Sequence, residues 1–258
     1  MTHKQFAITI AKKAGKVIRR NFGMGMKKQW KENDTPVTVT DLQINKMVIE
    51  GVKKYFSKHD VLGEEESHRP NNSKFLWVCD PVDGTIPFSH GIPTCVFSLA
   101  LVYDGSPILG VVYDPFMDRM WFAEKGKGAF LNNKKIKVNK NNLKNSVVNW
   151  ESSSSYLVVK QNPKVIFVRL SCFIYGCMLV ASGELAAAFY PWQYPHDGAT
   201  AKIIVEEAGG KVTDKIGNDQ SYDKKINGCL VSNGKVHKDL LKITKRIDTW
   251  KKTEKIKF

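Results

Sequence analysis

The sequence predicts an α/β protein with two fused lobes, and three observations lead to this fold class. The apolar run Phe75–Cys79 is typical of a buried strand, and a turn with two carboxylates follows it directly. Helix-like and strand-like patterns succeed one another on both sides of that strand. A stretch rich in Asn, Lys and Ser, residues 134–155, then interrupts the apolar pattern. We therefore predict one lobe over residues 1–140 and a second over residues 141–258.

The first lobe is predicted to open with two helices. Apolar residues at helical spacing continue to about Phe22, and Gly23 can end this first helix. The second helix is predicted to begin after Asp41 and to run to about Tyr55, so that Asp41 lies at a helix start. The segment between them, Lys31–Thr40, alternates like a strand or a loop.

Several strands are predicted in the rest of the first lobe. Cys95–Tyr103 and Ile108–Tyr113 are joined by a short Asp-Gly-Ser-Pro turn, which favours a hairpin. Further strands are expected around Trp121–Ala123 and Ala129–Leu131.

The second lobe alternates between strand and helix. Its predicted elements are a strand at Val165–Val168, a helix from about Ser171 to Gly183, a helix from Asp197 to Gly209, and strands at Lys211–Thr213 and Gly228–Val231.

Two carboxylates lie close together in Asp80-Pro81-Val82-Asp83-Gly84-Thr85, after the predicted strand Phe75–Cys79. They would repel one another unless both faced water or a cation held them together, as oxygen ligands hold Mg²⁺. The same residues also suit an ordinary turn, in which Pro fixes φ and Gly takes a positive φ.

Two further acidic clusters favour the metal site. Glu64-Glu65-Glu66 follows a short apolar run, and Asp197 lies in Pro195-His196-Asp197-Gly198. Each cluster is at the edge of a predicted element, so the fold could bring it to the Asp80 turn. The alternatives are a solvated acidic run for the glutamates and a simple helix N-cap for Asp197, although a cap can also bind a cation.

These motifs, together with Val37–Asp41 and Glu206–Gly210, resemble the inositol monophosphatase family in their order and approximate spacing. The similarity extends from the first helix to Val231-Ser232-Asn233-Gly234, which is nearly the whole chain. The resemblance implies a layered αβαβα sandwich of the sugar-phosphatase type, with the site between the lobes and with Asp197 and the substrate wall supplied by the second lobe.

The resemblance also implies a set of two or three Mg²⁺ ions. By similarity, Glu64, Asp80 and the backbone carbonyl of Val82 hold one ion. Asp80, Asp83 and Asp197 hold a second, so Asp80 bridges the two.

The catalytic roles follow from the same resemblance. Asp41 and Thr85 would orient and activate the attacking water, for which they must lie within hydrogen-bond reach of each other. Glu65 would act through a water or through another ligand. The backbone amides of Gly84 and Thr85, at a predicted helix start, would hold phosphate oxygens.

The implied activity is a Mg²⁺-dependent, lithium-sensitive phosphomonoesterase. Its substrate would be a small phosphate ester such as an inositol phosphate, histidinol phosphate or a sugar phosphate, and the family suggests homodimers. A nucleotidase for 3′(2′),5′-bisphosphates is the alternative within the enzyme class.

Departures from the family concern the substrate side of the site. Tyr190 replaces the carboxylate of inositol-hydrolysing members, and a tyrosine cannot accept two diol hydrogen bonds as a carboxylate does. His196 stands where a Trp is common. Its side chain would contact the substrate, influence the metal site or pack into the space that the Trp side chain occupies. Ile86-Pro87 and Ser171-Cys172 stand where a polar pair and a Gly-Ser pair are usual, and Asn149–Arg169 is short.

Cysteines and hydropathy indicate a cytoplasmic protein. The five cysteines show no metal-ribbon spacing, and most lie in apolar runs, so we predict buried, reduced thiols. No run of about 18 apolar residues could cross a bilayer, and lysines at helical spacing interrupt the N-terminal apolar face, unlike a signal peptide.

A formal charge of +15 leaves a binding function open. Such a surface could steer phosphorylated substrates or bind nucleic acid through phosphate contacts, with the phosphatase activity incidental. We favour solvated lysine-rich faces instead, because no basic groove with interleaved aromatic residues and no nucleic-acid motif is present.

Overall fold

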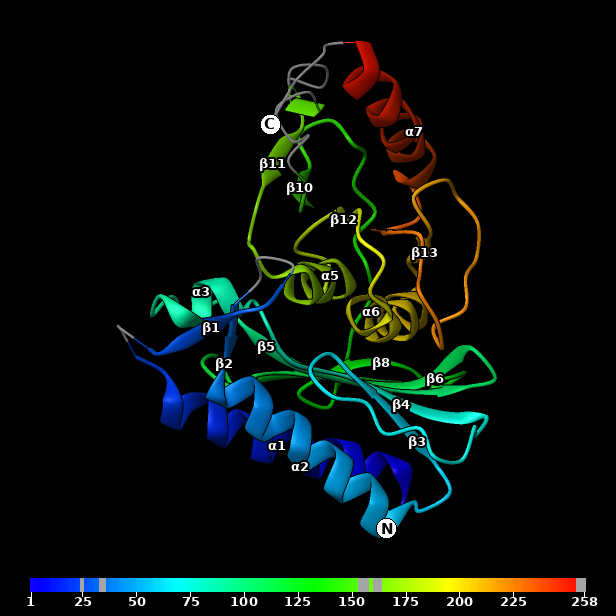
Figure 1. Cartoon of the computed structure of the whole chain (residues 1–258). Helices are drawn as coiled ribbons and strands as arrows, with labels where there is room; N and C mark the ends of the chain where they lie inside the picture. The colour runs from blue at the N-terminus through cyan, green and yellow to red at the C-terminus, as the bar shows by residue number, and fades with distance from the viewer. Residues whose placement is uncertain (24–25, 33–35, 153–157, 160–163, 254–258) are drawn as a thin grey trace.

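Five layers of helices and sheets are stacked in the structure, a computed structural model that describes residues 1–258 except 24–25, 33–35, 153–157, 160–163 and 254–258. From one outer face to the other the order is helices, sheet, helices, sheet and helix (Figure 1). The layered sandwich expected from the resemblance is therefore confirmed. The helices are α1 (His3–Asn21), α2 (Val39–Tyr55), α3 (Thr85–Ser89), α5 (Phe173–Ala181), α6 (Pro195–Glu207) and α7 (His237–Thr253).

The first sheet has seven strands in the order β3-β4-β5-β6-β7-β8-β9. β3 and β4 pair in parallel, and every later pair is antiparallel, which includes the predicted hairpin of β5 and β6. The strands are β3 (Asp60–Gly63), β4 (Phe75–Asp83), β5 (Val96–Tyr103), β6 (Ser106–Asp114), β7 (Arg119–Glu124), β8 (Gly128–Leu131) and β9 (Lys134–Lys135).

The second sheet has five strands in the order β11-β10-β12-β14-β13. β10 is parallel to both β11 and β12, whereas β14 is antiparallel to β12 and β13. Its strands are β10 (Val147–Trp150), β11 (Ile166–Val168), β12 (Ala187–Tyr190), β13 (Lys211–Thr213) and β14 (Cys229–Ser232). A separate two-stranded ribbon consists of β1 (Lys28–Trp30) and β2 (Pro36–Thr38).

Capping boxes begin both N-terminal helices, which cover the outer face of the first sheet (Figure 1). Thr2 and Gln5 exchange hydrogen bonds at the start of α1, and Thr38 and Asp41 do so at the start of α2. α2 therefore begins before Asp41, and the N-cap is Thr38. The prediction that Asp41 lies at a helix start holds, but the predicted beginning after Asp41 is wrong, because α2 already begins at Val39.

α5 and α6 lie between the two sheets, and their apolar side chains belong to one core with residues of both sheets. Ile174 of α5 and Ile204 of α6 are completely buried there with Trp121 of β7 and Val231 of β14. α7 covers the far face of the second sheet (Figure 1). The division into lobes at residue 140 stays a prediction.

All five cysteines are free and buried, as predicted. Within the described ranges, no helix has the length and apolar character needed to cross a membrane.

Candidate functional site

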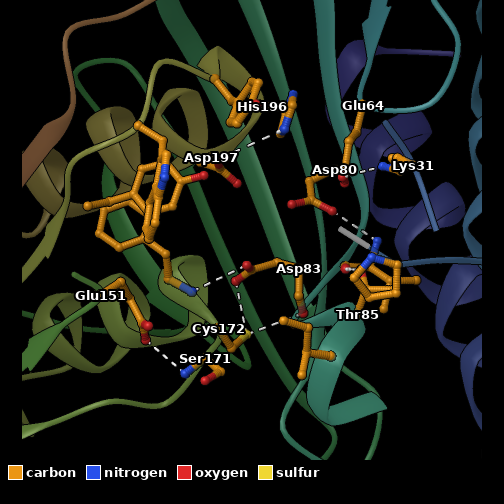
Figure 2. Close-up of a pocket in the computed structure, with 18 of the residues that line it drawn as sticks. Lys31, Glu64, Asp80, Asp83, Thr85, Glu151, Ser171, Cys172, His196 and Asp197 are labelled. Atoms are coloured by element: carbon orange, nitrogen blue, oxygen red, sulfur yellow. Dashed lines mark hydrogen bonds and ion pairs between the residues drawn. The ribbon is translucent and has the colours of Figure 1, made fainter. Parts of the chain in front are cut away.

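A cavity of about 690 Å³ opens between the end of β4 and the first turns of α5 and α6. Figure 2 shows acidic side chains converging on it from elements that are far apart in the sequence. Nine of the predicted site residues line this cavity: Glu64, Asp80, Val82, Asp83, Gly84, Thr85, Tyr190, His196 and Asp197.

Three buried carboxylates form the centre of the site. Asp80, Asp83 and Asp197 each place an oxygen within 4.8 Å of the oxygens of the other two. Asp80 and Asp83 are three residues apart on β4, and in a regular strand they would point to opposite faces. Pairing with β5 shifts register between these two residues, and this irregularity turns both carboxylates into one cavity. The predicted strand therefore extends beyond Cys79 to Asp83.

Asp197 comes to the cluster from the first turn of α6, where the helix dipole favours a negative charge. It is not the N-cap that the sequence allowed, because the cap position is Tyr194. The Tyr190 hydroxyl donates a hydrogen bond to the Asp197 carboxylate. The Oδ2 atom of Asp197 is buried and has no hydrogen-bond partner among the described residues. An orphaned carboxylate oxygen in an acidic cavity fits a cation.

Burial makes this cluster hard to ionise without a cation. Burial, and then the charges of Glu64 and Asp83, raise the pKa of Asp80 well above its usual value. The pKa of Asp197 is raised by burial and then by Asp83. Burial also raises the pKa of Asp83 to about 7. Because the donors are all oxygens and their charges repel, the residues fit Mg²⁺.

Asp83 also holds the start of α5. Its Oδ2 accepts hydrogen bonds from the Ile174 amide at 2.7 Å and the Cys172 thiol at 2.9 Å, and its Oδ1 accepts one from the Phe173 amide at 3.2 Å. These bonds oppose the effect of burial on its pKa. One carboxylate thus joins β4 of the first sheet to a helix of the central layer.

Asp41 and Thr85 lie within hydrogen-bond reach, as their proposed role requires. The Thr85 hydroxyl lies 3.3 Å from Asp41 Oδ1 and 2.9 Å from the Val82 carbonyl oxygen. It has a single proton, so it can donate to only one of the two at a time. Burial raises the pKa of Asp41 to about 6, although hydrogen bonds from the Thr38 hydroxyl and amide oppose this.

Glu64 and Glu65 are held by a lysine rather than by the aspartate cluster. Lys31 Nζ lies 2.8 Å from Glu64 Oε1 and 2.6 Å from Glu65 Oε1. Burial lowers the pKa of Lys31, but the two glutamates outweigh it and raise that pKa overall. Burial and the neighbouring Glu64 raise the pKa of Glu65 to about 7. The ammonium group of Lys31 is therefore the positive charge that contacts Glu64 in this structure (Figure 2).

Gly84 is required by the turn that leads into α3. Its φ of +90° lies in the left-handed region, and an added Cβ would lie 2.5 Å from the Thr94 carbonyl oxygen. The turn thereby fixes Val82 and Thr85 on either side of it.

His196 and Ser171 occupy two positions at which the family usually has other residues. The His196 side chain is 11% exposed, stacks on Tyr194, and has its Nε2 3.9 Å from Asp197 Oδ2. Burial lowers its pKa, which favours the neutral ring. Ser171 has a φ of +54°, so it keeps the left-handed backbone that a glycine would supply. Part of the short Asn149–Arg169 segment, 153–157 and 160–163, lies outside the described residues.

Several wall residues were not found from the sequence. They are Lys31, Glu151, Arg169, Phe173, Trp192 and Tyr194. The alternation of aromatic residues in Tyr190-Pro191-Trp192-Gln193-Tyr194 is the sequence signal that could have indicated an aromatic wall. Lys31 has no comparable signal, because its partners lie more than thirty residues away.

Known proteins share this architecture over nearly the whole chain. The family model of the inositol monophosphatase family matches residues 2–249. A fructose-1,6-bisphosphatase/inositol-1-monophosphatase from Thermotoga maritima is 30% identical, with 96% of this chain and 97% of the relative covered. A histidinol-phosphatase from Chlorobaculum parvum is 33% identical, with 92% and 94% covered. The structure of a Thermotoga maritima IMPase superposes with a TM-score of 0.89 at 28% identity, covering 96% of this chain and 99% of that one.

The family match and the names of these relatives confirm the predicted class of phosphoric monoester hydrolase. The motifs, the layered fold and the similarity along almost the entire length lead to one assignment: this chain belongs to the inositol monophosphatase family.

Proposed function

We propose that the chain is a Mg²⁺-dependent phosphomonoesterase that hydrolyses a small phosphate ester in the cavity beside Asp80, Asp83 and Asp197. The observation that carries the proposal is the approach of these three carboxylates to within 4.8 Å of one another next to the Asp41–Thr85 pair. Acid–base groups and a cation-binding cluster in one cavity are what hydrolysis of a phosphate ester requires.

The metal ligands are assigned as the family resemblance implies. Asp80, Asp83 and Asp197 would hold one Mg²⁺, and Glu64, Asp80 and the Val82 carbonyl a second. Bound Mg²⁺ supplies positive charge at the phosphoryl group. Lys31 engages only Oε1 of Glu64, so Glu64 would bind the ion through Oε2 or after releasing this ion pair.

The protein's own groups would position water and phosphate. In this role Thr85 would donate to Asp41 and not to the Val82 carbonyl, so its hydroxyl oxygen would be left to accept a hydrogen bond from the attacking water. Asp41 is the proton acceptor behind it. Gly84 and Thr85 would bind phosphate oxygens through their backbone amides, and Glu65 would act through a water or another ligand.

Three further properties belong to this proposal: inhibition by Li⁺, a homodimer and a cytoplasmic location. The family resemblance supports all three. Ile86, within α3 at the cavity, and Ile92, shortly after α3, are about half exposed and offer an apolar surface for a second copy. Sedimentation velocity would test the dimer.

The activity is tested with a panel of phosphomonoesters assayed in Mg²⁺, in EDTA and in Mg²⁺ with Li⁺. We expect turnover that needs Mg²⁺ and that Li⁺ inhibits. Asp83→Asn should abolish nearly all of it while the protein stays folded. The matched control is Asp104→Asn, an exposed carboxylate at a distant turn, which should behave like wild type. Unchanged turnover in Asp83→Asn would refute the metal assignment.

A further inference from the structure

The cavity wall beyond the carboxylates is aromatic. Phe173 and Tyr190 stack with their ring centroids 4.8 Å apart and their planes 24° apart, and Trp192 lies 4.6 Å from Tyr190 at 54°. Tyr194, on the same wall, is stacked on His196. Phe173 is the first residue of α5, whereas the other three rings come from the end of β12 and the segment that leads into α6, next to Asp197.

Tyr190 is fixed in this wall and cannot replace a carboxylate that binds substrate hydroxyls. Its ring is held by Phe173 and Trp192, and its hydroxyl proton is donated to Asp197. A phenol has one proton to donate, and here it serves the cluster. The position therefore offers substrate a ring instead of two acceptor oxygens.

Trp192 and Tyr194 line the cavity and are only partly buried. Trp192 is 42% exposed and Tyr194 39% exposed, although both line the cavity wall. Aromatic rings that remain exposed at a cavity gain stabilisation when a flat apolar ligand covers them.

Two other charged residues of the cavity wall, Glu151 and Arg169, already form an ion pair. The Glu151 side chain is buried and its two oxygens lie 2.8 Å from the Ser171 amide and 3.4 Å from Arg169 Nε. A polyol hydroxyl that binds here would share Glu151 with these two contacts.

We propose that Tyr190, Trp192 and Tyr194 form a subsite for a planar nitrogen heterocycle carried by the leaving alcohol of the phosphate ester. The chain would then prefer esters that bear an imidazole or a purine over polyol phosphates. This inference rests on the proposed phosphatase function and names the substrate class of the same cavity.

The test compares kcat and KM for four esters in Mg²⁺: L-histidinol phosphate, adenosine 3′-phosphate, myo-inositol 1-phosphate and glycerol 2-phosphate. Wild type should have its highest kcat/KM on one of the first two, and which of them it favours distinguishes imidazole from purine. Trp192→Ala should lower kcat/KM about tenfold on that ester, mainly through KM, as loss of a stacking face does. Trp192→Phe should restore most of it, and glycerol 2-phosphate should change less than about twofold.

Tyr103→Ala is the matched control. This tyrosine is also 42% exposed, but it is the last residue of β5 and does not line the cavity. The substitution should leave all four reactions unchanged. An equal loss on all esters in Trp192→Ala, or a wild-type preference for a polyol phosphate, would overturn the subsite.

A binding measurement separates this inference from the phosphatase proposal. Saturation-transfer NMR on metal-free protein would compare the phosphate-free alcohols L-histidinol, adenosine and myo-inositol. Stronger saturation transfer to a heterocycle than to myo-inositol, lost in Trp192→Ala, supports the subsite even if no ester is hydrolysed. Equal signals from all three alcohols contradict it, whatever the activity.

Discussion

The buried carboxylates predict that the metal-free protein loses stability as the pH rises and that Mg²⁺ reverses this loss. Burial raises the pKa of Asp83 from 3.8 to about 7, so between these values the folded state holds a proton that the unfolded state has released. This contribution to stability is fully present below about pH 4 and is lost as the pH rises through about 7.

The size of the effect follows from the same pKa. A change from 3.8 to about 7, at 1.36 kcal/mol per pH unit, corresponds to an upper limit of about 4 kcal/mol. For a chain of this length that is about 10 °C in Tm. Asp80 and Asp197 act in the same direction, because burial raises their pKa values too. A divalent cation that binds the ionised carboxylates removes the penalty.

The assay is thermal unfolding in EDTA and in excess Mg²⁺, from about pH 5 to about pH 8. In EDTA the Tm should fall as the pH rises, and Mg²⁺ should raise it more at high pH than at low pH. Asp83→Asn should flatten the pH dependence, since it removes one titrating group and a charge that acts on the other two. Asp104→Asn should keep the wild-type slope. A Mg²⁺ effect that is the same at both ends of the range, or a wild-type slope in Asp83→Asn, would show that these carboxylates do not titrate as a buried cluster.

The other predictions concern residues around the cluster. Thr85→Ala should lower kcat by about 10²–10⁴-fold, and Thr85→Ser should recover activity. The wild-type kcat/KM should fall below about pH 6 as Asp41 is protonated. Steady-state kinetics at a series of pH values measures all three effects. Tyr190→Phe removes the donor to Asp197 and should weaken Mg²⁺ binding by about 10–100-fold in calorimetry, whereas unchanged affinity would show that the hydroxyl does not position this carboxylate. Gly84→Ala should cost at least about 2 kcal/mol of unfolding free energy in urea, because φ is +90° and the new Cβ would meet a carbonyl oxygen at 2.5 Å.

Much of the fold was predictable because its signals are local. The two N-terminal helices follow from the 3.6-residue spacing of their apolar residues, and the β5–β6 hairpin from two β-rich runs around a turn. β13 was predicted with its observed limits. The predicted helix boundaries were less accurate. At α2 the capping box of Thr38 and Asp41 sets the helix start, a few residues before the predicted one.

The sequence indicated Glu64, Asp80, Asp83 and Asp197 as site residues, but it did not indicate how they are arranged or which other residues line the cavity. Carboxylates beside turns indicate a cation site, but the register shift that turns Asp80 and Asp83 into one cavity depends on pairing with β5. The pairing of Lys31 with Glu64, and the contact of Cys172 with Asp83, join segments that only the tertiary fold brings together. Long-range contacts of this kind have no local pattern from which to predict them.

Crystals soaked in Mn²⁺ would show whether Asp80, Asp83 and Asp197 together hold a divalent cation. Anomalous scattering locates this ion independently of any assumption about ligands. We expect a peak bound by oxygens of Asp80, Asp83 and Asp197 in wild type and none there in Asp83→Asn. Absence of a peak among these carboxylates in wild type, with Mn²⁺ bound elsewhere or not at all, would contradict this expectation.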